Sequence, residues 1–280
     1  MKKILVPTDF SENALLAAKY AADLCQRQGY TLHILHYYTV NSSGFSENDL
    51  KIETTQPDIL KADLTILKWV ELLKQEYPTV NITQENKRGL ISERLVHEAK
   101  ETQYLAIVMG TTGSSANKNI FWGSNTSSVI AKSPIPVIAV PNTRQYAEIK
   151  NVGLLTNFKE EELLTLREFL NIYQEAIALH LIHVHENNED IQSRLKSWLF
   201  NIQEFPLVTN TNILTAPLVK DDKNKDSIPE VIKHLTETNE LNMILVSKSR
   251  KTFFQRLFSN SVSKAMALEL KKPAFFGKSI

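Results

Sequence analysis

The chain has 280 residues, of which 42% are hydrophobic and 22% are charged, and its formal net charge is +1. This composition is typical of globular proteins and excludes disordered and fibrous classes. A charge so close to zero provides no overall attraction to nucleic acid or to a membrane surface, so we expect neither as a partner.

The sequence also shows no pattern of a signal peptide or of a membrane-spanning segment. The opening MKKILVPTDF has only three apolar residues between its lysines and Pro7, too few for the core of a signal peptide. No run approaches the roughly eighteen apolar residues of a membrane span. The single cysteine, Cys25, excludes an intramolecular disulfide framework and lies in a helical pattern that predicts its burial. We therefore expect a cytoplasmic location.

Strand and helix patterns alternate through the first half of the chain. Short apolar runs predict strands at 2–7, 30–38, 79–84, 104–110 and 135–141. Apolar residues at helical spacing predict helices at 11–28, 58–77, 91–101 and 124–133, the first of them capped by Ser11. This alternation predicts a doubly wound parallel sheet.

The second half repeats the order, and matching segments support a duplication. ILVPTDF is echoed by VGLLTNF, TLHILH by ALHLIH, AIVMG by MILVS, and SPIPVIAV by LKKPAFFG. The polar stretch NTRQYAEIK separates the two copies. We predict one domain at 1–142 and a second at 150–280.

Three of the eight glycines, Gly110, Gly113 and Gly123, lie within MGTTGSSANKNIFWGSNT. This stretch joins the predicted strand 104–110 to the helix 124–133, and ligands of open parallel sheets bind at such an edge. Glycine allows a close approach of the main chain and a positive φ, and the start of a helix favours an anion. The spacing predicts a loop that wraps phosphates; the alternative is that the glycines only form tight turns.

Together with VPTDFS after the first strand and ILHYY on the second, the spacing G-x2-G-x9-G-[ST] resembles the universal stress protein family in its tandem, two-domain form. The resemblance implies two tandem doubly wound parallel five-stranded sheets with strand order 3-2-1-4-5, of the adenine nucleotide alpha hydrolase-like class. It implies ATP between the first and fourth strands, with or without Mg²⁺. It also implies that the strands in PVIAV and PAFFG pair within the chain, and it leaves a homodimer and an unknown protein partner open.

The resemblance assigns ligand contacts to the first half. It places Pro7, Thr8 and Asp9 at the adenosine end, with Asp9 as a hydrogen-bond acceptor, although an aspartate here is also a candidate helix cap. Tyr37 stands where the family usually has valine beside adenine, so it either stacks on the base or blocks it. The contacts to nucleoside and phosphates fall to Met109, Gly110, Thr112, Gly113, Gly123, Ser124 and Asn125.

Besides Tyr37, two of these positions depart from the family pattern. Thr112 stands where many members have histidine, and Asn125 replaces a small apolar residue. In the second half the loop itself is lost, because an ungapped alignment sets Ser247, Arg250 and Asn260 opposite the three glycines. Side chains at positions of close approach or positive φ obstruct such a loop. We predict no ATP site there.

Two further features of the C-terminal half are a basic stretch and a pair of histidines. The stretch 247–258 is basic with aromatic residues interleaved, which indicates either a solvated loop or a surface for a phosphate, a nucleic acid strand or an acidic partner. His183 and His185 have no third ligand nearby, so we interpret them as structural.

No set of nucleophile, base and orienting residue emerges from the sequence, so nothing requires catalysis. The prediction is an ATP-binding stress or regulatory protein with one nucleotide site in the first domain. A scaffold that binds no nucleotide and a slow ATPase remain the alternatives.

Overall fold

The computed structural model describes residues 1–38, 56–101, 103–111, 124–142, 148–185, 191–217, 228–247 and 272–278. We call residues 1–141 the N-terminal half and residues 148–278 the C-terminal half. The N-terminal half contains β1 (Lys3–Thr8), α1 (Glu12–Gln28), β2 (Thr31–Tyr38), α2 (Gln56–Glu76), β3 (Ile82–Arg88), α3 (Ile91–Glu98), β4 (Tyr104–Gly110), α4 (Ser124–Lys132) and β5 (Val137–Val140).

The described residues of the C-terminal half repeat this alternation of strands and helices as far as β9. Its elements are β6 (Asn151–Leu155), α5 (Glu160–Tyr173), β7 (Ile177–His185), α6 (Ile191–Ile202), β8 (Val208–Pro217), α7 (Ile228–Thr238), β9 (Met243–Val246) and β10 (Ala274–Phe276). The strand expected at 79–84 is β3, which begins and ends later than expected. Its side chains are mostly polar because it is the outermost strand, and an apolar pattern therefore locates it poorly.

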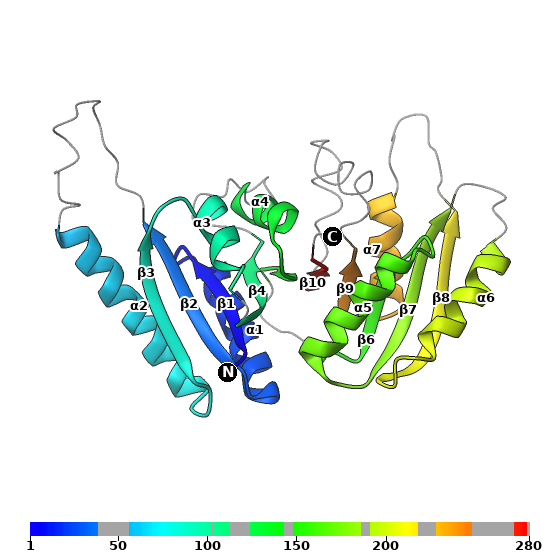
Figure 1. Ribbon diagram of the computed structural model, residues 1–280, viewed down its shortest axis with the longest axis horizontal. Coiled ribbons are helices and arrows are strands. Elements are labelled where there is room, and N and C mark those ends of the chain that lie inside the picture. Colours follow the sequence, from blue (N-terminus) through cyan, green and yellow to red (C-terminus); the bar gives the residue numbers. More distant parts are fainter. Residues whose placement is uncertain are drawn as a thin grey trace.

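The strands form a single sheet in the order β3-β2-β1-β4-β5-β10-β9-β6-β7-β8. Each half has the predicted order 3-2-1-4-5, and its own strands are parallel. The two five-stranded sheets are continuous rather than separate, because β10 pairs antiparallel with β5, with Phe275 opposite Ile138. The predicted pairing of the last strands within one chain is confirmed, and Figure 1 shows the two halves side by side across this junction.

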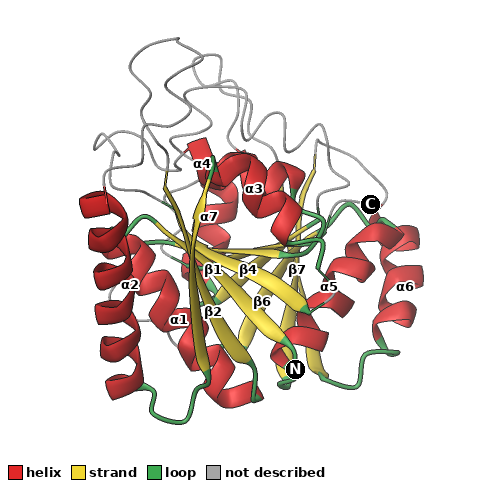
Figure 2. Cartoon of the chain, turned by 60° about the vertical axis from the view of Figure 1, so that its left-hand side comes forward, coloured by secondary structure: helices red, strands yellow, loops and turns green. Residues whose placement is uncertain are grey.

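Helices cover both faces of the sheet, as the alternation of strands and helices predicts (Figure 2). The helices α1, α2, α5 and α6 contribute to one buried apolar cluster, and α3, α4 and α7 contribute to the other. Both clusters contain residues of the two halves, so each core is continuous across the β5–β10 junction. The fold is therefore a doubly wound α/β structure, with one core layer on each side of the sheet.

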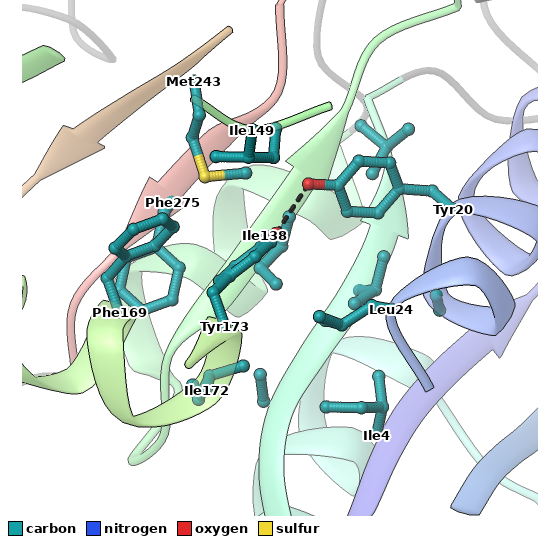
Figure 3. Close-up of a cluster of buried hydrophobic side chains, with 14 of the residues drawn as sticks. Ile4, Tyr20, Leu24, Ile138, Ile149, Phe169, Ile172, Tyr173, Met243 and Phe275 are labelled. Atoms are coloured by element: carbon teal, nitrogen blue, oxygen red, sulfur yellow. Dashed lines mark hydrogen bonds between the residues drawn. The ribbon is translucent and has the colours of Figure 1, made fainter. Parts of the chain in front are cut away.

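Side chains of α1 and α5 meet at the centre of the first cluster (Figure 3). Leu24 and Phe169 are fully buried there, and the hydroxyls of Tyr20 and Tyr173 lie 2.6 Å apart. At the rim, Arg27 forms two contacts of 2.6 and 2.8 Å with the carboxylate of Glu175. Apolar burial and polar contacts thus join the halves on this face of the sheet.

Local sequence explains the ends of α1. Ser11 caps the helix as predicted, because its hydroxyl oxygen accepts a hydrogen bond from the Ala14 amide at 3.2 Å. Gly29 closes the helix with φ 68°, a left-handed conformation that glycine adopts without strain. Cys25 is buried in the helix, and burial raises the pKa of its thiol to about 12, so the thiol stays protonated and unreactive.

Within the described ranges, no helix is both long and apolar enough to cross a membrane.

Candidate functional site

The site begins at the turn between β1 and α1, which lies at the carboxyl end of β1. Phe10 has φ 61°, a strained value for a residue with a side chain. Two side chains of the turn hold this conformation: the Thr8 hydroxyl accepts from the Phe10 amide at 2.9 Å, and a carboxylate oxygen of Asp9 accepts from the Ser11 amide at 3.0 Å. The carboxylate of Asp9 is exposed and therefore accessible to a ligand.

The neighbouring strand β4 ends beside this turn. In the sheet, β1 lies between β2 and β4. After β1 the chain continues to β2 on one side, and after β4 it continues to β5 on the other side. The Gly110 carbonyl, at the end of β4, accepts from the Thr126 hydroxyl of α4 at 2.9 Å. This bond holds the first turn of α4 over the carboxyl end of β4. The N-terminal half therefore has its switch point where ligands of such sheets bind.

Gly110 has a packing role that the sequence did not indicate. A Cβ atom built there would lie 2.6 Å from Oδ1 of Asn13, a buried residue in the first turn of α1. The amide of Asn13 donates to the Val140 carbonyl of β5 at 3.2 Å. Asn13 thus links α1, β4 and β5, and it requires glycine at position 110 whether or not a ligand binds.

Tyr37 extends from β2 toward the face that α3 covers. Its ring packs against the cluster that contains Met109, and its hydroxyl is buried without a hydrogen-bond partner among the described residues. Burial raises the pKa of this hydroxyl well above its usual range, with the nearby carboxylate of Glu98 adding to the shift. The hydroxyl is therefore a protonated donor, and the ring lies on the same face of the sheet as Met109.

The structure brings together only part of the predicted set. Pro7 and Thr8 end β1, Asp9 follows, Met109 and Gly110 end β4, and Ser124 and Asn125 begin α4. Asn125 is exposed at that helix start. Thr112, Gly113 and Gly123 lie outside the described residues, as do the stretch 248–258 and Asn260 of the C-terminal half.

A histidine supports the β1–α1 turn from the opposite face of the sheet, and the arrangement is repeated in the C-terminal half. His36 Nδ1 lies 2.8 Å from the Thr8 carbonyl, and the His36 ring is 4.3 Å from that of Phe10. The corresponding distances from His183 are 2.9 Å to the Thr156 carbonyl and 5.0 Å to the ring of Phe158. His36 and His183 therefore hold the two turns in the same way, in agreement with the structural role expected for His183.

The C-terminal turn differs in what stabilises it. Phe158 repeats the φ of 61°, but the buried carboxylate of Glu162 replaces the contacts of Asp9 and Ser11. It accepts from the Thr156 hydroxyl at 2.7 Å and from the amides of Asn157 and Lys159 at 3.0 and 3.1 Å. A negative charge of the protein itself thus occupies the donors of this turn.

Sequence reasoning missed both Asn13 and Glu162. Alignment of the two β1-like segments puts Glu162 opposite Ala14, a carboxylate opposite a methyl group, and that mismatch was an available signal. For Asn13 we find no comparable signal, because its partners lie far along the chain.

The fold and this edge define a doubly wound α/β protein with a topological switch point in the N-terminal half, the position at which sheets of this kind bind ligands. The family model for the universal stress protein family matches residues 1–141, which include that switch point. The chain belongs to the universal stress protein family.

Relatives and solved structures agree with this assignment. A universal stress protein of Methanocaldococcus jannaschii is 30% identical over 149 residues, which cover 51% of this chain and 84% of the relative. One from Thermus aquaticus is 31% identical over 147 residues, 50% of this chain and 98% of the relative. The crystal structure of a universal stress protein from Archaeoglobus fulgidus matches 99% of this chain and 96% of its own, with TM-score 0.72 and 18% identity. The last likeness establishes the fold of the whole chain.

Proposed function

We propose that the N-terminal half binds an adenine nucleotide, ATP in the first instance, and that the protein acts in stress response or regulation through binding rather than turnover. The observation that carries the proposal is the position of Asp9. Its exposed carboxylate follows β1 directly, at the switch point between β2 and β4, in a turn whose conformation is held by Thr8, Asp9 and His36. A carboxylate at this position can accept hydrogen bonds from the hydroxyls of a ribose.

The beginning of α4 supports the proposal for the phosphate end. Thr126 ties this helix to the end of β4, so the amides of its first turn lie beyond the strand end. Unpaired amides and the helix dipole favour an anion there, and the first turn of α4 contains no acidic residue. The proposed contacts remain those of the family motif, with Ser124 and Asn125 at the helix start. Whether a magnesium ion accompanies the triphosphate is left open.

The contrast between the halves supports a single nucleotide site. Glu162 fills the donors of the C-terminal turn with a buried carboxylate of the protein itself, whereas Ala14 leaves that place apolar in the N-terminal half. We propose a nucleotide-binding domain at 1–142 and a second domain at 150–280 that completes the sheet without binding a nucleotide. A cytoplasmic location fits the proposal.

A matched pair of variants tests the asymmetry. Asp9→Ala removes the exposed carboxylate, and Asn157→Ala removes the side chain at the equivalent position. Calorimetric titration of purified protein with ATP should give affinity at least tenfold lower for Asp9→Ala and unchanged for Asn157→Ala. Circular dichroism should report that both variants remain folded.

Other outcomes would separate the alternatives. Absence of binding heat in the unmodified protein, together with no nucleotide released on denaturation, would leave an interaction scaffold as the better description. Magnesium-dependent phosphate release that Gly113→Val abolishes would instead indicate slow hydrolysis.

A further inference from the structure

A cavity lies between the ends of β2 and β3 and the helix α3. Its volume is about 360 Å³, within the range of sites for small molecules. The residues that line it are Tyr37, Lys87, Arg88, Arg94, His97 and Glu98. Of these, Tyr37 alone belongs to the set predicted from the family motif.

The cationic groups of this cavity are not all neutralised. Lys87 Nζ lies 2.7 Å from Glu98 and 3.1 Å from Glu85, so the nearby carboxylates are already engaged with lysine. The guanidinium groups of Arg88 and Arg94 have no carboxylate partner within the part of the chain that the structure describes. Two free guanidinium groups at one cavity favour a doubly charged anion.

The fold also positions one of these arginines. Gly89 has φ 143°, and a Cβ atom there would lie 2.6 Å from Cγ of Arg94. The stem of Arg94 therefore packs into the space that the missing side chain leaves, next to the amide of Gly89, which donates to the Tyr38 carbonyl at 3.0 Å. Packing of the stem reduces the conformational freedom that binding would otherwise remove.

The third element is Tyr37, which lines the same cavity and whose hydroxyl is buried without a partner among the described residues. A buried hydroxyl without a hydrogen bond is costly, and it is neutral and protonated here, so it can donate to an acceptor that enters from outside. An anion with several acceptor oxygens would satisfy it and both guanidinium groups together.

We propose that this cavity binds a phosphate monoester through Tyr37, Arg88 and Arg94. The site goes beyond the proposed nucleotide function: it shares Tyr37 with the predicted nucleotide contacts, whereas Arg88 and Arg94 lie outside that set. The monoester supplies a dianionic group with three acceptor oxygens, and the cavity is larger than a bare phosphate, which leaves room for a small organic group. His97, at the rim, is a further donor toward the anion.

Titration with inorganic phosphate and with ribose 5-phosphate tests the site directly. Nuclear magnetic resonance would follow the Nε–H signal of Arg94 and the ring signals of Tyr37. Both should shift saturably with each probe, and the ester should bind at least as tightly as inorganic phosphate. Saturation without movement of these signals, or exclusion of the ester, would overturn the proposal.

Three variants sharpen the test. Arg94→Gln should lower affinity for ribose 5-phosphate about tenfold, as loss of one charge-assisted contact implies, and Tyr37→Phe should lower it several-fold. Lys68→Gln removes an exposed charge from α2, outside the cavity, and should change nothing. Equal effects of Arg94→Gln and Lys68→Gln would contradict the site.

The same measurements separate this proposal from the nucleotide site. Asp9→Ala should leave the shifts of Arg94 and Tyr37 unchanged, because its carboxylate does not line the cavity. Failure of ATP binding with intact phosphate-ester binding would refute only the proposed function, and the reverse result would refute only the second site.

Discussion

The hydroxyls of Tyr20 and Tyr173 share a buried hydrogen bond of 2.6 Å that joins α1 of the N-terminal half to α5 of the C-terminal half (Figure 3). Burial raises the pKa of Tyr173 well above its ordinary value, so its hydroxyl stays protonated. The bond lies inside the larger apolar cluster, next to the β5–β10 pairing, and the two halves are therefore expected to unfold as one cooperative unit.

This bond should show in stability as a pair effect. Tyr20→Phe leaves the Tyr173 hydroxyl buried without its partner and should lower the free energy of unfolding by about 1–3 kcal/mol. Adding Tyr173→Phe removes that orphaned hydroxyl and should restore part of the loss. A double-mutant cycle by urea denaturation measures the coupling, and strictly additive losses would argue against it.

Glu162 should matter more than its neighbours on α5. Glu162→Gln keeps the size of the side chain but replaces one acceptor oxygen with a donor. The new donor would face groups of the turn that themselves donate to the carboxylate. We expect a loss of about 2 kcal/mol or more in unfolding free energy. Glu160→Gln, an exposed change in the same helical turn, serves as the control and should stay within about 0.5 kcal/mol. Matching losses would mean that the carboxylate does not stabilise the turn.

The packing of Gly110 against Asn13 predicts a specific rescue. Gly110→Ala places a methyl group 2.6 Å from the Asn13 amide oxygen and should destabilise the protein by roughly 1–3 kcal/mol. Combining it with Asn13→Ala removes the clashing amide, so the double variant should be more stable than the sum of the single effects predicts. Thermal or urea unfolding of the four proteins decides the matter; simple additivity would exclude the contact as the cause.

Two histidines make stability sensitive to mild acid. Burial lowers the pKa of His180, whose ring nitrogens have no hydrogen-bond partner within the described residues, and burial with the charge of Lys3 lowers that of His33. Because the unfolded chain binds protons more readily at these positions, stability should be fully present above the ordinary histidine pKa of about 6.5 and should fall below it.

Urea unfolding at pH 7.5 and pH 5 measures this loss. His180→Leu should reduce the difference between the two pH values, whereas substitution of the exposed His97 should not. An undiminished pH dependence in His180→Leu would assign the effect to other groups.

Much of the architecture could be predicted from the chain because it depends on local patterns. Apolar runs and helical spacing located the central strands and their helices, and the repeated segments TLHILH and ALHLIH lie on β2 and β7, which hold corresponding positions in the sheet order. Prediction was poorer for β3, since an edge strand buries little and carries a weak apolar pattern. For the site, the motif predicted that Asp9, Met109 and Gly110 lie at one edge of the sheet, and the strand ends agree. Their roles toward a nucleotide stay predictions.

The sequence by itself determined the alternation of elements, the matching segments of the two halves and the family, because each depends on neighbouring residues or on short motifs. Only the tertiary structure decided that Gly110 accommodates Asn13, that Glu162 stabilises the second turn, and that Tyr37 lines a cavity with Arg94. The Asn13 bond to Val140 spans 127 residues, and the other contacts likewise depend on how separate elements pack. Such contacts form only when the sheet and its helices bring distant side chains together, and no local pattern encodes that distance.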